Sequence, residues 1–124
     1  MTAWVADELA RLAGRDEIGV ASTRTDGSLR PFVTVWFVRA GDDLIVRSAH
    51  GPENGWFRRA LASGVGRIRG AGIERNVTFE VPGPEAHEAL DAAYHAKYDR
   101  YGTGMVRTVV SPDATRSTLR LVPR

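Results

Sequence analysis

Residues 29–39 read Leu-Arg-Pro-Phe-Val-Thr-Val-Trp-Phe-Val-Arg and are the most strand-like stretch of the chain, because β-branched and aromatic residues fill it. A hairpin signal, Thr25-Asp26-Gly27-Ser28, comes just before this stretch, and the turn pair Gly41-Asp42 follows it. These turns connect it to further expected strands over residues 17–24 and 43–48. Because hairpin turns join antiparallel strands, the first half of the chain is predicted to be an antiparallel meander.

The rest of the chain supplies three more strands and three helices. The strands are expected over residues 65–70, 73–81 and 115–122. The helices are expected over residues 2–13 with Thr2 as the cap, from Asn54 to about Ser63, and from about Glu85 to Arg100. Strands joined by short turns, with a few crossing helices, favour a small antiparallel β-barrel in which residues 1–124 form a single domain.

The composition narrows the classes of function. Of the 124 residues, 43% are hydrophobic and 26% charged, as in globular domains rather than disordered chains. There is no Cys, which excludes disulfide bonds, a thiol nucleophile and any metal site with Cys ligands. The longest apolar stretch, Phe32 to Val38, is far too short to span a membrane. The N-terminus lacks the basic start of a signal peptide, so we expect a cytoplasmic protein with no membrane partner.

The charged residues point to a small anionic partner. Lys and Arg number 17 against 15 Asp and Glu, and Lys97 is the only lysine. A protein that binds nucleic acid usually carries a larger positive excess on one face, so we expect no nucleic-acid partner. Arginine binds phosphate through two parallel hydrogen bonds. The composition therefore favours a phosphate-bearing small molecule.

Segment 48–59 has the features of an anion site. Ser48 and the loop after it lead to Asn54, which caps a helix whose first N–H groups attract anions. Arg58 and Arg59 lie one turn into that helix. The alternative is a solvated helix face with an ordinary cap. Trp56 either stacks on a bound ring or packs the helix against the barrel.

Several motifs in this order resemble the deazaflavin-dependent nitroreductases, which belong to the FMN-binding split-barrel superfamily. The runs are Thr23-Arg24-Thr25-Asp26-Gly27, Trp36-Phe37-Val38, Gly41-Asp42-Asp43-Leu44-Ile45-Val46-Arg47-Ser48 and Asn54-Gly55-Trp56-Phe57-Arg58-Arg59-Ala60-Leu61. A related family of short uncharacterised proteins shares the segment Gly51-Pro52-Glu53-Asn54-Gly55-Trp56. The resemblance covers residues 18–122. It implies an α+β, mainly β fold: a six-stranded antiparallel split β-barrel with an N-terminal helix, a short helix after strand 3 and a longer helix before the last strand.

The resemblance also implies a site. It places FMN or an 8-hydroxy-5-deazaflavin coenzyme in a groove at the interface of a homodimer, to which we expect strand 29–39 to contribute. Position by position, Arg24 matches the turn arginine of the nitroreductases, Ser48 the loop serine, Trp56 the helix tryptophan and Arg59 the helix asparagine. With the anion-site features, the predicted cofactor-binding residues are Arg24, Ser48, His50, Asn54, Trp56, Arg58 and Arg59. Two cationic positions differ: Thr25 replaces one lysine, and Ala49 or His50 the other.

The third helix offers candidate catalytic residues. Tyr94, Tyr98 and Tyr101 lie on one stripe at helical spacing. The stripe either packs the helix on the barrel or covers the groove, with Tyr94 and Tyr98 donating hydrogen bonds to a substrate. His87 and His95 are eight residues apart, which is not the spacing of metal ligands on one helix, so no metal site is expected.

Two functions remain open from the sequence. The first is a flavin- or deazaflavin-dependent oxidoreductase, similar to nitroreductases or quinone reductases, acting on a small organic molecule. Its cofactor would carry the hydride chemistry, which explains the lack of an acid–base motif. The second is a small-molecule-binding or interaction barrel that has lost redox cofactor binding, which the replaced lysines favour. Fold alone does not decide between an enzyme and a binding protein.

Overall fold

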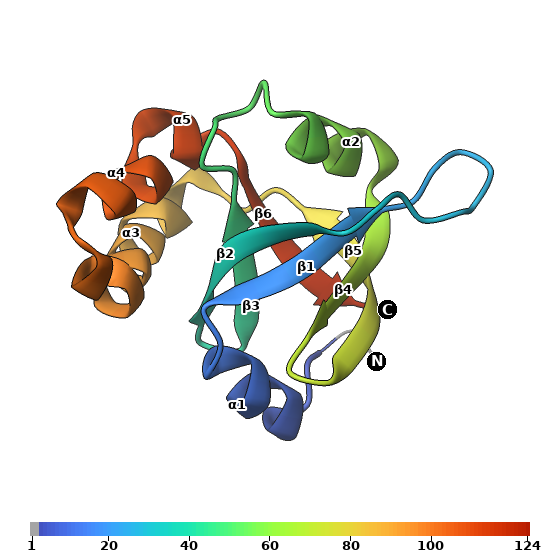
Figure 1. The fold of residues 1–124 in the computed structure, drawn as a ribbon, viewed down its shortest axis with the longest axis horizontal. Helices are drawn as coiled ribbons and strands as arrows, with labels where there is room; N and C mark the ends of the chain where they lie inside the picture. The colour runs from blue at the N-terminus through green and yellow to red at the C-terminus, as the bar shows by residue number, and fades with distance from the viewer. Residues whose placement is uncertain (1–2) are drawn as a thin grey trace.

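The computed structural model describes residues 3–124, and within this range six antiparallel strands close into a barrel (Figure 1). The strand order around the barrel is β1-β2-β3-β6-β5-β4. The strands are β1 (Glu17–Ser22), β2 (Val33–Ala40), β3 (Asp43–Arg47), β4 (Val65–Gly70), β5 (Ile73–Glu80) and β6 (Thr118–Pro123). The predicted six-stranded antiparallel barrel is confirmed. The hairpin at residues 25–28 is also present, with Gly27 at the positive φ of 89° that the turn requires.

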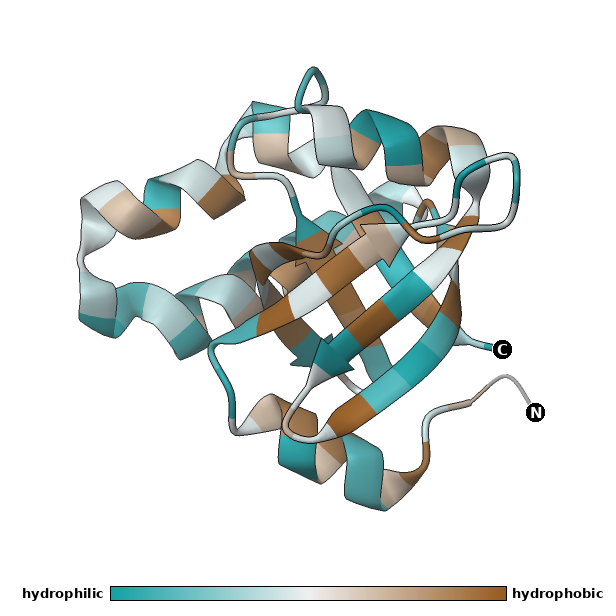
Figure 2. Ribbon diagram, turned by 45° about the vertical axis from the view of Figure 1, so that its right-hand side comes forward, coloured by the Kyte–Doolittle hydropathy of each residue, from teal (hydrophilic) through white to brown (hydrophobic). Residues whose placement is uncertain are grey.

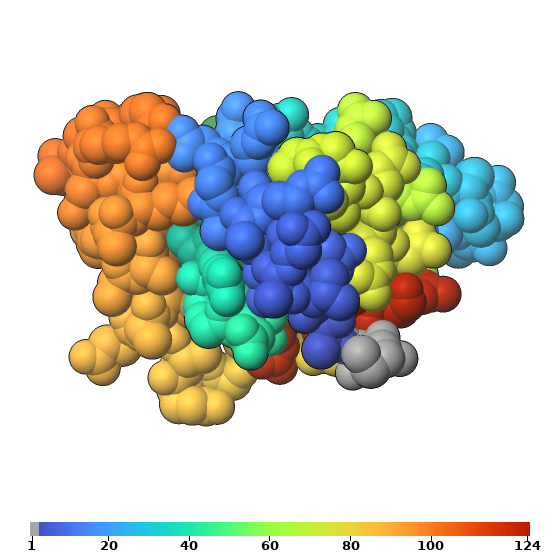
Figure 3. All heavy atoms as spheres, turned by 90° about the horizontal axis from the view of Figure 1, so that it is seen from below, coloured from blue at the N-terminus to red at the C-terminus, as the bar shows by residue number. Residues whose placement is uncertain are grey.

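Helices cover both ends and one side of the barrel. They are α1 (Ala6–Ala13), α2 (Gly55–Ser63), α3 (His87–Tyr98), α4 (Thr103–Val110) and α5 (Pro112–Thr115), with 3₁₀ turns at Pro84–Ala86 and Asp99–Tyr101. In Figure 1, α2 lies over the upper end of the barrel and α3 to α5 lie along one side. Figure 3 shows α1 across the lower face. The first helix thus begins at Ala6, and the expected cap Thr2 lies outside the described residues.

The main core fills the barrel. Phe37, Leu44 and Leu119 point inward from neighbouring strands and are fully buried, and the apolar strand residues stand out in Figure 2. Leu9 and Leu12, three residues apart on the apolar face of α1, join this core from below. The barrel is therefore a packed core whose ligand sites must lie at its ends or on its outside.

A second apolar cluster joins the outside of β2 to α3. The ring of Trp36 stacks on that of Tyr98 with centroids 4.1 Å apart, and Val38 packs in the same cluster. The neighbour Phe37 faces the barrel interior, as the alternation of a strand requires. The apolar surplus of β2, which we expected to be covered by a second protomer, is thus largely covered by α3 of the same chain.

The segment after α3 differs from the sequence-based prediction. No helix was predicted between residue 100 and the last strand, but α4 and α5 fill this segment, and β6 begins at Thr118 rather than at residue 115. Gly102, at φ 99°, caps α4 and turns the chain back on α3. Val106 and Val109 then reach the second cluster at helical spacing. Glycines here begin a helix rather than interrupt one.

Candidate functional site

A groove of about 390 Å³ opens where the N-terminus of α2 meets the barrel. Strand β2 forms one wall through Val33, Thr34 and Val35, and the loop after β3 contributes Ala49 and His50. Asn54, Gly55, Trp56 and Arg59 of α2 and its cap complete the lining, with Arg47 beneath. The groove therefore combines apolar side chains, a helix N-terminus and basic groups.

Local sequence fixes the start of α2 at this groove. The Oδ1 atom of Asn54 accepts the N–H of Trp56 at 3.2 Å, which is an N-cap. Trp56 and Phe57 are buried and hold the first turn on the barrel. No acidic residue stands in that first turn. The positive end of the helix dipole therefore faces the groove without a carboxylate from the helix to neutralise it.

Arg59 adds a second positive charge at the same place. Its guanidinium lies over Gly55: a Cβ atom built on Gly55 would come within 2.8 Å of Nη1 and 3.4 Å of Cζ. Any other residue at position 55 would have to displace the guanidinium from this place. A guanidinium resting on the positive end of a helix is electrostatically unfavourable unless an anion lies between or beside them. This arrangement is the strongest sign of an anion-binding site.

The arginines around α2 also lack carboxylate partners. Within residues 3–124, no carboxylate oxygen lies within 4.0 Å of the guanidinium nitrogens of Arg24, Arg30, Arg58 or Arg59. Elsewhere many arginines are paired, for example Arg75 with Glu8 at 2.6 Å and Arg100 with Asp16 at 2.6 Å. The α2 end of the barrel therefore holds four of the eight arginines that form no salt bridge within residues 3–124, although the net charge is only +2.

Arg47 lies beneath the groove in a different state. Its side chain is fully buried, and its guanidinium donates to Asp91 at 2.5 Å, to Thr118 Oγ1 at 3.0 Å and to the Val109 carbonyl at 2.8 Å. Its Nη2 lies 3.1 Å from Nδ1 of His87. These bonds join β3 to α3, α4 and β6. Arg47 is thus a neutralised structural cation that shapes the floor of the groove.

The structure brings only part of the predicted cofactor set together. His50, Asn54, Trp56 and Arg59 line the one groove. Arg24 lines an adjoining groove, and Arg58 lies on the outer face of α2.

Ser48 does not line the groove. It is fully buried, and its Oγ accepts the N–H of His50 at 3.3 Å, so it orders the loop instead. Trp56, only 8% exposed, packs α2 on the core and offers one edge to the groove.

Tyr94 and Tyr98 lie in the second cluster, away from the groove lining. Both are fully buried. The Tyr98 hydroxyl lies 2.6 Å from the Phe37 carbonyl, and the Tyr94 hydroxyl 3.5 Å from that of Ile45. Burial raises the pKa of both hydroxyls above the ordinary tyrosine value. The arrangement gives them a role in holding α3 on β2 and β3, and provides no contact with a molecule in the groove.

Three residues of this region are not among the predicted site residues: Arg30, Arg47 and Gly55. Gly55 directly follows a good N-cap, where a glycine gains nothing for the helix, and that is a usable signal for close approach of another group. Arg47 on β3 and Arg30 before β2 gave no sequence signal for a site, because arginines on strands and hairpins are usually solvated.

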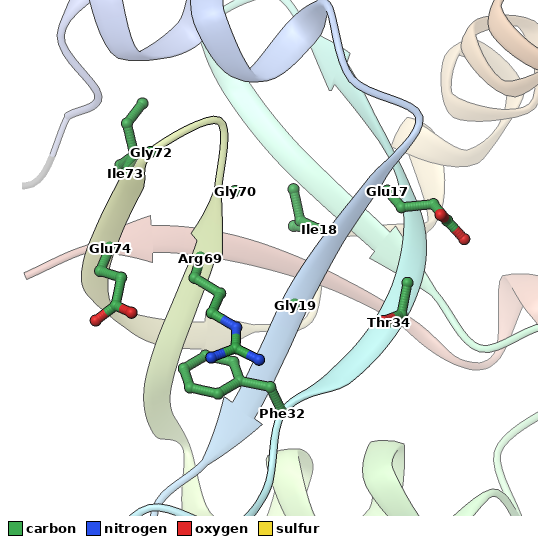
Figure 4. Close-up of a pocket in the computed structure, with 10 residues that line it drawn as sticks. All are labelled: Glu17, Ile18, Gly19, Phe32, Thr34, Arg69, Gly70, Gly72, Ile73 and Glu74. Carbon is green, nitrogen blue, oxygen red and sulfur yellow. The ribbon is translucent and has the colours of Figure 1, made fainter.

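A larger groove of about 660 Å³ lies on the outside of β1, β4 and β5 (Figure 4). There the guanidinium of Arg69 stacks on the ring of Phe32, 4.1 Å from its centroid, over the bare backbone of Gly19. Glu17 and Glu74 also line this groove. Its charges are mixed, so it lacks the unbalanced positive charge of the α2 groove.

Two further observations concern the described residues only. Among them, no three His, Asp or Glu side chains are grouped so that they could hold a metal ion. No described helix has the length and apolar character needed to cross a membrane.

Solved structures of similar fold include several proteins of the split-barrel type. A conserved hypothetical protein of Mycobacterium tuberculosis is 16% identical with a TM-score of 0.63, over 99% of this chain and 82% of that one. HutZ, the heme storage protein of Vibrio cholerae, is 11% identical with a TM-score of 0.65, over 96% and 89%. An F420-H2 dependent reductase is 14% identical with a TM-score of 0.63, over 87% and 94%. These likenesses establish the split-barrel fold alone.

No curated protein matches the sequence. The model of one protein family matches residues 8–121, nearly the whole chain. The chain belongs to this family, DUF2255, described as uncharacterized protein conserved in bacteria.

Proposed function

We propose that the chain binds FMN or an 8-hydroxy-5-deazaflavin coenzyme with its phosphate at the N-terminus of α2, and acts as an oxidoreductase on a small organic molecule. The observation that carries this proposal is the Arg59 guanidinium lying over Gly55 at a helix end without a carboxylate. The fold shared with an F420-H2 dependent reductase supports the choice of coenzyme class.

The donors at this helix end fit a phosphate group. Asn54 occupies the N–H of Trp56, which leaves the N–H groups of Gly55 and Phe57 in the first turn as donors for an anion. Arg59 supplies charge-assisted hydrogen bonds from the side of the helix. His50, at the rim of the same groove, adds a further ring nitrogen. Backbone, guanidinium and imidazole thus replace the two lysines that the nitroreductases place near the phosphate.

The chain's own residues would orient and shield the coenzyme ring. Val33, Val35 and Trp56 form the apolar part of the groove, next to the anion donors. A bound flavin or deazaflavin supplies the hydride chemistry, while the protein supplies orientation and exclusion of water. His50 contributes the imidazole of the groove, whose ring nitrogens can donate or accept a hydrogen bond with a bound molecule.

A binding function without redox chemistry is the second candidate. His50 and Arg59 in one groove would also suit a ring that carries carboxylates and takes an imidazole ligand, and HutZ, of the same fold, is a heme storage protein. The groove would then hold its ligand without turnover. Titration with hemin tests this candidate in parallel.

Titration of the purified protein with FMN, deazaflavin coenzyme and hemin decides between these functions. We expect FMN or the deazaflavin to bind with a saturable change in cofactor fluorescence, and the protein loaded with the reduced coenzyme to reduce a nitroaromatic or quinone substrate while the coenzyme is oxidised. Binding of hemin alone supports the second candidate. If none of the three binds, the oxidoreductase function and heme binding are excluded, and a barrel that binds another small molecule is the alternative that is left.

We also propose a homodimer. Trp36 and Val38 are covered by α3, so the support comes from apolar residues that stay partly exposed: Phe32 in the groove outside β1, β4 and β5, and Val33 in the groove at α2. Sedimentation at tens of micromolar, about the range in which a specific interface holds, tests the proposal. A monomer under these conditions would contradict it.

A further inference from the structure

A second groove lies beside the α2 site, between the β1–β2 hairpin and the C-terminal half of α2. Its volume is about 370 Å³, and Thr23, Arg24, Arg30, Arg59 and Ser63 are among its lining residues. No Asp or Glu lines it. Arg59 lines both this hairpin groove and the α2 groove, so the two adjoin at that side chain.

The hairpin holds Arg24 in a fixed position. Nη1 of Arg24 donates to the Leu29 carbonyl at 2.9 Å and lies 3.3 Å from Ser28 Oγ. The carboxylate of the hairpin, Asp26, is occupied by the turn: its Oδ1 accepts the N–H of Ser28 at 2.9 Å and the Ser28 hydroxyl at 2.6 Å. Nε and Nη2 of Arg24 therefore remain as donors with no acceptor in the part of the chain that the structure describes.

Arg30 is the less expected member of the groove. Its backbone N–H donates to Ser22 at 3.0 Å, which fixes its place at the base of the hairpin. Its side chain is half-buried, yet it has no salt bridge to any described carboxylate. Partial burial of an unpaired cation costs free energy. Arg24 and Arg59 are exposed but line the same hollow, so the three positive charges repel one another, and a bound anion relieves both costs.

We propose that the hairpin groove is a second anion subsite, formed by Arg24, Arg30 and Arg59, and that it takes a phosphate or carboxylate group of the ligand whose first phosphate binds at α2. This inference rests on the proposed function for the α2 site. It selects a coenzyme that carries a further anionic group beyond its first phosphate, and disfavours one such as FMN whose chain ends in a single phosphate.

Calorimetric titration with inorganic phosphate, tripolyphosphate and citrate tests the subsite without any coenzyme. We expect tripolyphosphate to bind about tenfold or more tightly than phosphate, because it engages both anion sites. If the second site accepts carboxylates, citrate should also bind more tightly than inorganic phosphate. If the second site is specific for phosphate, citrate should bind no more tightly than inorganic phosphate.

Variants locate the preference in the hairpin groove. Arg24→Ala and Arg30→Ala should each reduce the preference for tripolyphosphate to about threefold or less while phosphate affinity stays unchanged. Arg59→Ala should weaken both anions. Arg107→Ala is the matched control, because Arg107 is exposed on α4 and has no described carboxylate partner. Arg24 is exposed on the hairpin, so its variant tests the subsite even if Arg30→Ala is unstable.

The possible results separate the two proposals. An equal preference for tripolyphosphate in the parent, Arg24→Ala and Arg30→Ala proteins overturns the second subsite, as does an equal loss in Arg107→Ala. Failure of FMN and deazaflavin to bind, together with a tripolyphosphate preference that depends on Arg24 and Arg30, removes the proposed function and leaves the subsite. Coenzyme binding that is unchanged in Arg24→Ala and Arg30→Ala supports the proposed function and overturns the second subsite.

Discussion

Arg47 and Arg59 line the same groove, but one is fully buried and fully hydrogen-bonded while the other is exposed and has no carboxylate partner. Arg47 belongs to the side of the barrel where α3, α4 and β6 converge, and its charge is matched by Asp91. Arg59 belongs to the α2 end, where Arg24, Arg30 and Arg58 are likewise unpaired within residues 3–124.

The difference separates a structural cation from a binding cation. A buried guanidinium is tolerable only with its hydrogen bonds complete, so Arg47 stabilises the fold only as part of its network. Unpaired guanidiniums near a helix N-terminus gain no ion-pair stabilisation in the free protein and repel one another. Substitutions should therefore affect stability on the α3 side and ligand binding at the α2 end.

Removing the partner of Arg47 should have the largest effect. Asp91→Ala leaves a fully buried guanidinium without its carboxylate, and we expect a loss of about 3 kcal/mol in the free energy of unfolding. Urea denaturation measures it. Asp113→Ala is the control, because both side chains of the Asp113–Arg116 pair are exposed. The free energy of unfolding should fall by less than about 0.5 kcal/mol in this variant. Equal losses in the two variants would erase the distinction between paired and surface arginines.

Arg59→Ala should show the opposite behaviour. We expect coenzyme or phosphate binding to weaken by about 1.5–3 kcal/mol, the contribution of a charged hydrogen bond, with the free energy of unfolding unchanged or slightly higher. Fluorescence titration of FMN and the deazaflavin, beside urea denaturation, measures both. A variant that binds as well as the parent removes Arg59 from the site.

Sequence patterns predicted the barrel well because turns and strands are local. The hairpin at residues 25–28 and the Asn54 cap each depend on neighbouring residues, and both are found as expected. The site was harder, because a strand arginine acquires its meaning from partners far along the chain: Arg47 meets Asp91 forty-four residues later. The same holds for Tyr98, whose helical stripe was compatible with a site and whose hydroxyl in fact meets the Phe37 backbone.

Lys97 sharpens the comparison, because it is a cation on the structural side that forms no salt bridge with any described carboxylate. Its Nζ donates to the Phe37 carbonyl at 3.1 Å and lies 3.6 Å from the centroid of the Phe37 ring. Burial lowers the pKa of Lys97 to about 8, although nearby Asp16 acts in the opposite direction. Between pH 8 and its ordinary pKa of 10.5, the unfolded chain therefore binds more protons than the folded one at this residue. The contribution of Lys97 to the free energy of unfolding should therefore rise with pH across that window.

Lys97→Met should therefore stabilise the protein at pH 7 by about 1 kcal/mol. This is less than the whole pKa shift of Lys97 would give, because the ammonium keeps some solvent contact. The gain should shrink by pH 9.5, and ionisation of tyrosines in the unfolded chain affects the parent and the variant alike. Urea denaturation at the two pH values measures the change. A gain that is the same at both would show that packing, and not the proton, is responsible.

Gly55→Ala separates binding from stability at one atom. The backbone of Gly55 is not in the left-handed region, so alanine fits the helix and should add up to about 0.5 kcal/mol to the free energy of unfolding. The new Cβ, however, would fall within 2.8 Å of the Arg59 guanidinium and must displace it from the helix end. We expect phosphate affinity to fall by about three- to tenfold while thermal stability rises slightly.

Gly104→Ala, in the first turn of α4 with no atom within 4 Å of the added Cβ, should change stability alone. If Gly55→Ala binds phosphate as the parent does, the position of Arg59 over the helix end has no part in anion binding, and the α2 end differs from the α3 side only in being solvated.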